Sequence, residues 1–330
     1  MNISLISRID KIIRFNSLQY LRIIASLSVV FFHIEQGINR KYWVVDKYTE
    51  LFLWGQQGVS LFFCLSGFVI SYSSYIRPKK CFEFLYSRIV RIYPAYLLIF
   101  FIFIVSLILL PYKNLNLTEI LNAIFFNFGK STGYVHVGWT LFYEMIFYVI
   151  FSLIINNFKS IAKNDFFIYF ISILLICSYL TSSKYITDFI VGITVFLIQL
   201  FSPKRYKSIA FITLMFSFIA GIFFNPLSFS LGIILIAIIN SEKFLSNLFN
   251  SDFILSLADA SYSIYLVQVL TISFSLKISR FITLNTFNNY YFMYLISFFI
   301  SIIITITLGI LMRKFVEIPS YNFLRKFKYL

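Results

Sequence analysis

The sequence has few charged residues, and this scarcity restricts the class of protein. Only 12% of the 330 residues are charged, while 60% are hydrophobic; soluble domains carry about 25% and about 45–50% respectively. A soluble core of this size could not bury so much apolar surface. The composition therefore excludes a soluble globular domain, a disordered chain and a typical nucleic-acid binder. It predicts an all-α, polytopic integral membrane protein.

Cysteine and histidine are also scarce. The three cysteines form no C-x-x-C pair, and Cys64 and Cys177 fall inside apolar runs. This pattern indicates neither a disulfide framework nor a zinc site, and we expect no metal. The two histidines, His33 and His136, are informative because there are no others.

Apolar runs long enough to span a bilayer, which takes about 20 residues, occur along the whole chain. We therefore expect about ten transmembrane helices within one membrane-embedded domain, residues 1–330, without a fused soluble domain. The segment 114–138 fits this pattern poorly, because polar residues interrupt it, and predicts a surface helix or a re-entrant segment. The ten runs are centred near Val29, Phe68, Phe101, Phe147, Leu174, Ile193, Phe216, Ile234, Leu266 and Ile302.

Basic residues exceed acidic ones, with 28 Lys and Arg against 13 Asp and Glu. If the N-terminus is cytoplasmic, 19 of the basic residues fall on cytoplasmic segments, eight on the opposite side, and Arg22 lies within the first span. Positive residues concentrate on the cytoplasmic side of membrane proteins. The asymmetry predicts that both termini are cytoplasmic and explains the net charge without a nucleic-acid partner.

Polar groups inside the predicted spans are candidates for function, because charge is costly in a bilayer. Arg22 and His33 lie eleven residues apart, which is about three helical turns, so they share one face at about 16 Å separation. They would present a cation and a base to the same interior path. The alternatives are an arginine that extends to the inner interface and a histidine at the outer interface.

Three further charged residues lie near the ends of predicted spans. Glu144 enters a strongly apolar helix, where a carboxylate needs a cation, a histidine or water. It would either support His33 or serve as a structural partner of an arginine. Arg88 and Arg91 are three residues apart and share a helical face. The positive-inside rule accounts for this pair, and a phosphate-binding role accounts for it equally well.

Six motifs, in order along nearly the whole chain, carry a resemblance to a known family. The first includes the Arg-x10-His spacing of Arg22 and His33, and the third is the Arg-x-x-Arg segment of Arg88 and Arg91. Together they resemble the membrane acyltransferase-3 family, and within it the exopolysaccharide and O-antigen acetylase branch. The segments are 18–33, 58–68, 88–94, 138–148, 261–266 and 315–319.

The sequence departs from the family pattern at three places. Members often have an acidic residue where Ser60 stands and a glycine where Ile23 stands. The late Tyr-Leu motif often continues with Trp-His, whereas here Val267 and Gln268 follow. No family role is assigned to these positions.

The resemblance implies a membrane O-acyltransferase in the bacterial cytoplasmic (inner) membrane. It would move an acyl group from cytoplasmic acyl-CoA to a sugar hydroxyl of a surface polysaccharide. The expected acyl group is acetyl, donated by acetyl-CoA, and the expected acceptor is the precursor of an O-antigen, exopolysaccharide or capsule. The expected partners are the lipid bilayer and a lipid-linked or nascent glycan. The residues involved would be His33, Arg22 and Glu144 in catalysis, Arg88 and Arg91 at the CoA phosphates, and Trp139, Tyr143 and His136 at the acceptor.

Several alternatives remain open from the sequence. His33 would act as a general base or as a transient acyl carrier. His136 would contact the acceptor or lie at the rim without a role. The donor could carry a succinyl group, and the acceptor could be peptidoglycan or a small molecule. A polytopic glycan transporter or flippase is a rival class, although it should show internal repeats or interrupted helix pairs.

Overall fold

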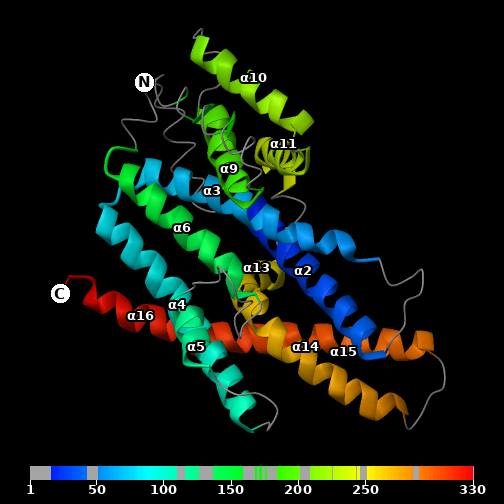
Figure 1. Cartoon of the computed structure of the whole chain (residues 1–330). Coiled ribbons are helices and arrows are strands. Elements are labelled where there is room, and N and C mark those ends of the chain that lie inside the picture. The colour runs from blue at the N-terminus through cyan, green and yellow to red at the C-terminus, as the bar shows by residue number, and fades with distance from the viewer. Residues whose placement is uncertain are drawn as a thin grey trace.

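Figure 1 shows a computed structural model of the chain. All secondary structure in the described part of the chain is helical, as the sequence predicts. The structure describes residues 16–42, 51–109, 116–125, 137–158, 168, 171–172, 175–176, 184–200, 209–224, 226–242, 244–245, 251–284 and 290–329.

Within the described residues, six helices are long and apolar enough to cross a membrane. They match the predicted runs near Val29, Phe68, Phe101, Phe147, Leu266 and Ile302, and they support a multi-pass membrane protein. Their bounds are α2 (Asn16–Tyr42), α3 (Gly58–Ile76), α4 (Cys81–Leu109), α6 (Gly138–Ile155), α14 (Ser261–Leu284) and α15 (Tyr290–Met312).

The other described helices are shorter. Three of them hold predicted runs near Ile193, Phe216 and Ile234, whereas most of the run near Leu174 lies outside the described residues. The count of ten spans and the cytoplasmic termini therefore stay predictions. The shorter elements are η1 (Leu53–Gln57), α5 (Leu117–Ile124), α9 (Lys184–Leu200), α10 (Ile209–Phe224), α11 (Pro226–Asn240), α13 (Asp252–Asp259), η2 (Arg313–Glu317), α16 (Ile318–Arg325) and η3 (Lys326–Tyr329).

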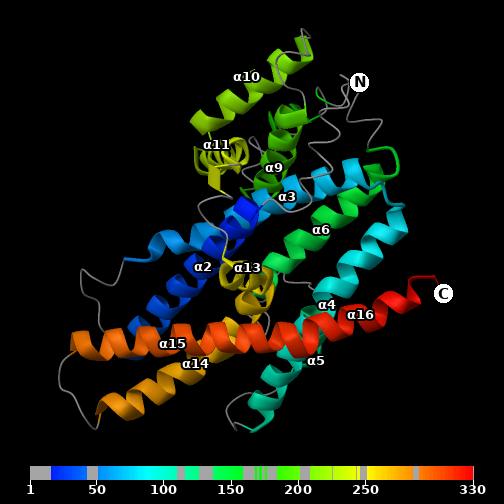
Figure 2. The same cartoon turned by 180° about the vertical axis from the view of Figure 1, so that it is seen from behind.

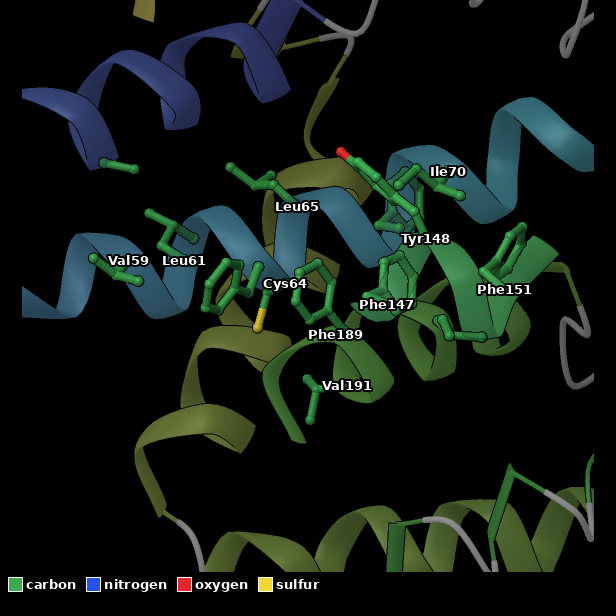
Figure 3. Close-up of a cluster of buried hydrophobic side chains, with 14 of the residues drawn as sticks. Val59, Leu61, Cys64, Leu65, Ile70, Phe147, Tyr148, Phe151, Phe189 and Val191 are labelled. Carbon is green, nitrogen blue, oxygen red and sulfur yellow. The ribbon is translucent and has the colours of Figure 1, made fainter. Parts of the chain in front are cut away.

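A buried apolar cluster joins α3, α6 and α9 (Figure 3). Phe147 of α6 stacks on Phe189 of α9 with ring centroids 4.1 Å apart. Glycines let α3 and α9 approach closely: a Cβ at Gly67 would meet the Phe189 carbonyl oxygen, and one at Gly192 would meet the Cys64 carbonyl oxygen. Small residues at such contacts are typical of packed membrane helices.

Helices α14 and α15 lie side by side in both views of the molecule (Figures 1 and 2). Three pairs of buried hydroxyls connect them, each at hydrogen-bond distance. Because water is absent from an apolar interior, such pairs satisfy polar groups that would otherwise be costly there. The pairs are Thr271 and Thr305 at 2.7 Å, Ser275 and Ser301 at 2.6 Å, and Ser279 and Ser297 at 2.9 Å.

The segment 114–138, for which the sequence left two readings open, contains the short helix α5. The Asn116 side chain caps it by accepting from the Thr118 N–H at 2.9 Å. The Tyr96 hydroxyl of α4 donates to the Ala123 carbonyl at 2.8 Å, so α5 packs against a long helix. Residues 126–136 of this segment lie outside the described part.

Polar contacts fix the end of α15 and helix α16 against the rest of the bundle. Arg313 forms an ion pair with Asp259 at 2.9 Å, and Ser263 donates to Glu317 at 2.7 Å. The segment Arg313–Glu317 is a π-helical turn, a local widening that often marks functional sites. These contacts hold the late motif residues beside the start of α14.

Candidate functional site

A cavity of about 470 Å³ opens between α2, α3, α4, α6 and α14. Its walls are mainly apolar, and six charged side chains line it. These charged side chains come from four different places in the sequence and include four of the predicted site residues. They are Arg22, Arg77, Lys79, Arg88, Arg91 and Glu144.

Three arginines, Arg22, Arg88 and Arg91, line this cavity and also a neighbouring one of about 340 Å³. The Arg22 guanidinium donates to Gln19 at 3.3 Å. Helices α2 and α4 thus bring Arg22, predicted in catalysis, and the Arg-x-x-Arg pair, predicted at the CoA phosphates, to one space. Like charges that converge repel one another, and an anion between them would relieve that repulsion.

The Arg88 side chain has an aromatic setting. Its guanidinium carbon lies 5.2 Å from the ring centre of Phe84 and 5.4 Å from that of Tyr148. Cation–π contacts of this kind hold a guanidinium in place without neutralising it. The Nε atom is buried and has no hydrogen-bond partner among the residues that the structure describes. Arg88 is therefore oriented by α4 and α6 while part of its donor capacity is unused.

Glu144 lies in the same cavity, where it accepts a short hydrogen bond from the Tyr148 hydroxyl one turn later on α6. The charges of Arg22 and Arg88 act on it at this site. The structure thus supplies the arginine partners that the sequence offered as one reading of Glu144. The other reading, support of His33, stays a prediction.

Thr140 and Tyr265 also line the cavity. Their hydroxyls are 2.9 Å apart, and the Tyr265 hydroxyl also lies 3.4 Å from the Val137 carbonyl. Both side chains are buried. This hydroxyl pair is a polar feature of a largely apolar wall, so a ligand in the cavity could form hydrogen bonds with it.

His33 lies on α2 beyond this cavity and is not among the described residues that line it. Its Nδ1 is 3.4 Å from the Oε1 of Gln268 on α14, which has no exposed surface. The Ser26 hydroxyl, two turns earlier on α2, donates to the Ser261 carbonyl at 3.1 Å with the same sequence offset. Helices α2 and α14 therefore run alongside each other in parallel, and the sequence analysis did not anticipate Gln268 as a neighbour.

Trp139 and Tyr143, predicted at the acceptor site, belong to an aromatic cluster with Tyr185 of α9. The Tyr185 ring centre lies 4.8 Å from that of Trp139 and 4.8 Å from that of Tyr143. All three side chains are partly exposed. Sequence reasoning missed Tyr185, since one tyrosine among 23 carries no signal by itself. The third predicted acceptor residue, His136, lies outside the described residues.

Asp188 is a second residue that the sequence analysis missed. It lies on α9 with no exposed surface, and its carboxylate is beside the hydroxyls of Ser60 and Ser228. Neither carboxylate oxygen reaches hydrogen-bond geometry with a described residue. Ser60 stands where relatives often have an acidic residue. Helix α3 thus lacks this carboxylate, and Asp188 supplies one from α9 across the contact between the two helices. The departure from the family pattern at Ser60 was the sequence signal that could have pointed to Asp188.

Comparisons with known proteins agree with the resemblance seen in the motifs. The profile of a family described as an acyltransferase domain matches residues 15–314. The chain is 32% identical over 115 residues to the exopolysaccharide production protein ExoZ of Rhizobium meliloti, covering 32% of this chain and 36% of that protein. It is 34% identical over 117 residues to nodulation protein 10 of Rhizobium leguminosarum bv. viciae, covering 34% of this chain and 29% of that protein.

The matched stretch spans about a third of the length of these curated relatives. No solved structure matches the chain. The family match covers most of the chain and favours an enzyme over the transporter that the sequence left open.

Proposed function

Because the chain belongs to the acyltransferase-3 family, we propose that it is a membrane O-acyltransferase of bacterial surface glycans. It transfers an acyl group from cytoplasmic acyl-CoA to a sugar hydroxyl of an exopolysaccharide, O-antigen or capsule precursor. The proposed acyl group is acetyl. A relative named for exopolysaccharide production supports this choice of acceptor. The bacterial inner membrane is the proposed location, because only there does a multi-pass protein meet both CoA and lipid-linked glycans.

The observation that carries the proposal is a mainly apolar cavity lined by four arginines, three of which also line the neighbouring cavity. Acyl-CoA has the matching polarity: its phosphates are anionic, and its pantetheine arm and acetyl group are neutral. Arginine suits phosphate because its planar fork donates two parallel hydrogen bonds. In this assignment Arg88 and Arg91 hold the pyrophosphate, and the arm extends toward Thr140 and Tyr265.

His33 is the proposed catalytic base. A sugar hydroxyl needs a base that titrates near the working pH, and histidine meets that need. The sugar oxygen attacks the thioester carbonyl carbon while its proton passes to the imidazole. The carbon–sulfur bond then breaks, and CoA leaves as the thiol when the imidazolium returns that proton. An acyl group carried briefly on His33 is the second form of the same transfer.

Arg22 is proposed to bind the donor. It lines the cavity and precedes His33 by about three turns on α2, about 16 Å, so the two side chains cannot act on one thioester carbonyl. There it would hold the anionic part of acyl-CoA together with Arg88 and Arg91. Glu144 would partly neutralise the arginine charges and so reduce their mutual repulsion when no ligand is bound.

A short distance separates the cavity from the proposed base. Tyr265, which lines the cavity, precedes Gln268 by three residues on α14. Three residues are about 4.5 Å along a helix axis. Gln268 in turn lies beside His33. The acyl end of the donor would therefore have to pass the Tyr265 and Thr140 hydroxyls to reach the base, so we assign the transfer step to this position.

The aromatic cluster of Trp139, Tyr143 and Tyr185 is the proposed acceptor platform. Partly exposed aromatic rings offer apolar faces to the C–H faces of sugars and polar edges to their hydroxyls. The cluster begins at Trp139, the residue immediately before Thr140. A sugar held there would lie on the side of the hydroxyl pair opposite the arginines.

Deletion of the gene and analysis of the surface glycans tests this function. We expect loss of base-labile O-acetyl groups, measured by proton NMR of the purified glycan, with recovery on complementation by the wild type. Complementation by His33→Ala should give no recovery at equal protein level. Unchanged O-acetyl content after deletion contradicts the proposed acceptor class.

A further inference from the structure

A second basic cavity lies beside the arginine cluster and is not explained by it. This cavity, of about 260 Å³, lies between the end of α3, the start of α4 and α16. We call it the basic cup. Its charged side chains are Arg77, Lys79, Arg325 and one carboxylate, Glu83. Tyr86, Ser87 and Tyr321 complete its polar lining.

The cup is assembled by tertiary contacts rather than by local sequence. The Tyr86 hydroxyl of α4 donates to the Leu324 carbonyl of α16 at 2.6 Å. This bond docks α16 against α4 and places Arg325, the next residue, across the cup from Arg77 and Lys79. The positive-inside rule accounts for basic residues at this end of the bundle, but it does not require them to surround one cavity.

The cup is continuous with the cavities that hold the arginine cluster. Arg77 and Lys79 line both the cup and the large cavity. Lys79 and Tyr321 also line the third cavity, which contains Arg88 and Arg91. Of the three cavities, Thr140 and Tyr265 line only the large one, Arg88 and Arg91 line the large and third ones, and Arg325 lines only the cup. The order is therefore the mainly apolar wall with Thr140 and Tyr265, the arginine cluster and then the cup.

Acyl-CoA has the same order of chemical groups. The acyl thioester and pantetheine arm come first, the pyrophosphate second, and the adenosine with its 3′-phosphate last. Resting on the proposed function, we propose that the basic cup binds the 3′-phosphate end of the CoA donor. Arg77, Lys79 and Arg325 are then specificity residues that distinguish CoA from its analogue without that phosphate. The guanidinium groups would donate charge-assisted hydrogen bonds to the phosphate oxygens.

Binding of CoA and of 3′-dephospho-CoA to the purified full-length protein in detergent, measured by calorimetry, tests the cup. The wild type should bind CoA at least about tenfold more tightly, since a tenfold difference is about 1.4 kcal/mol and hydrogen bonds to charged groups contribute about that much. The double variant Arg77→Gln with Lys79→Gln, and separately Arg325→Gln, should lose this preference. Arg325 lines the cup but neither of the other two cavities, so Arg325→Gln should keep the wild-type affinity for 3′-dephospho-CoA.

Two control variants separate the cup from its surroundings. Lys277→Gln removes a positive charge from an exposed position outside all three cavities and should change neither affinity. Arg88→Gln should weaken both ligands by the same factor, because both carry the pyrophosphate. This pattern would show that the loss of preference belongs to the cup alone.

Equal affinity of the wild type for the two ligands contradicts the proposal that the basic cup binds the 3′-phosphate, but it leaves CoA as the donor. A cup variant that keeps the wild-type preference contradicts this proposal as well. If the folded wild type binds neither ligand, the proposed donor itself is wrong, and the cup assignment falls with it.

Discussion

The Nδ1 atom of His33 lies 3.4 Å from the Oε1 atom of Gln268, in a buried contact between α2 and α14. An amide oxygen only accepts hydrogen bonds, so this contact favours the tautomer with the proton on Nδ1. The basic lone pair is then on Nε2, where a general base needs it. Gln268 stands where relatives often have histidine, so the residue beside the proposed base in this chain is one that does not titrate.

Gln268→Leu should lower kcat by about tenfold, since one net hydrogen bond contributes on the order of 1 kcal/mol. The KM for acetyl-CoA should not change, because Gln268 lies outside the residues that line the donor cavity. Steady-state kinetics with purified protein measure both values. Gln199→Leu makes the same exchange at an exposed hydrogen bond to Asn240 and serves as the control. A Gln268→Leu enzyme with wild-type kcat removes the positioning role.

Arg91→Gln should raise the dissociation constant for CoA by about tenfold, because it removes a charge-assisted contact to the pyrophosphate. Arg91→Lys should recover part of the affinity, as lysine keeps the charge but loses the planar fork. Calorimetry with the detergent-solubilised protein gives these constants. Wild-type CoA affinity in Arg91→Gln would place the phosphates elsewhere.

Glu144→Gln should tighten CoA binding, because the change removes the negative charge among Arg22, Arg88 and Arg91. The glutamine oxygen can still accept from Tyr148, so the local fold should persist. Comparison of the CoA dissociation constant with kcat distinguishes the two readings of Glu144. Weaker binding would contradict a charge-balancing role, whereas a lower kcat with unchanged binding would favour direct support of His33.

Gly192→Ala should destabilise the protein by about 1–3 kcal/mol, the usual cost of overpacking. Its Cβ would meet the backbone carbonyl of Cys64, which cannot move without shifting α3. Gly37→Ala is the matched control, since its Cβ would meet only the side-chain ends of Leu276 at 2.9 Å and Ile272 at 3.2 Å. Thermal unfolding in detergent should show a clearly lower Tm for Gly192→Ala than for Gly37→Ala. Equal Tm values would contradict the close α3–α9 contact.

The sequence predicted the helical class, the membrane environment and six of the spans, because apolar runs of that length have few other uses. It also predicted that Arg22, Arg88 and Arg91 are functional candidates, since charges in apolar helices are costly. It did not predict that α4 places Arg88 over Tyr148, and it left Glu144 between an arginine partner and His33, because helical periodicity gives a face but not its neighbour.

Tyr185, Asp188 and Gln268 were missed for the same physical reason. Each lies on a helix whose partner is distant in sequence, and each has a residue type that is common or unremarkable where it stands. Burial distinguishes Asp188 and Gln268, which have no exposed surface, but burial depends on the packed helices. The departures at Ser60 and at Gln268 were visible in the sequence, yet only the fold shows which residues face them.

Transfer of a radiolabelled acetyl group tests the central claim most directly. The purified protein, reconstituted with acetyl-CoA and glycan from a deletion strain, should place base-labile label on the glycan and release an equal amount of CoA thiol. His33→Ala should bind CoA as the wild type does and transfer no label. A wild-type protein that binds acetyl-CoA but labels no glycan, or a His33→Ala protein that transfers at the wild-type rate, would contradict the account.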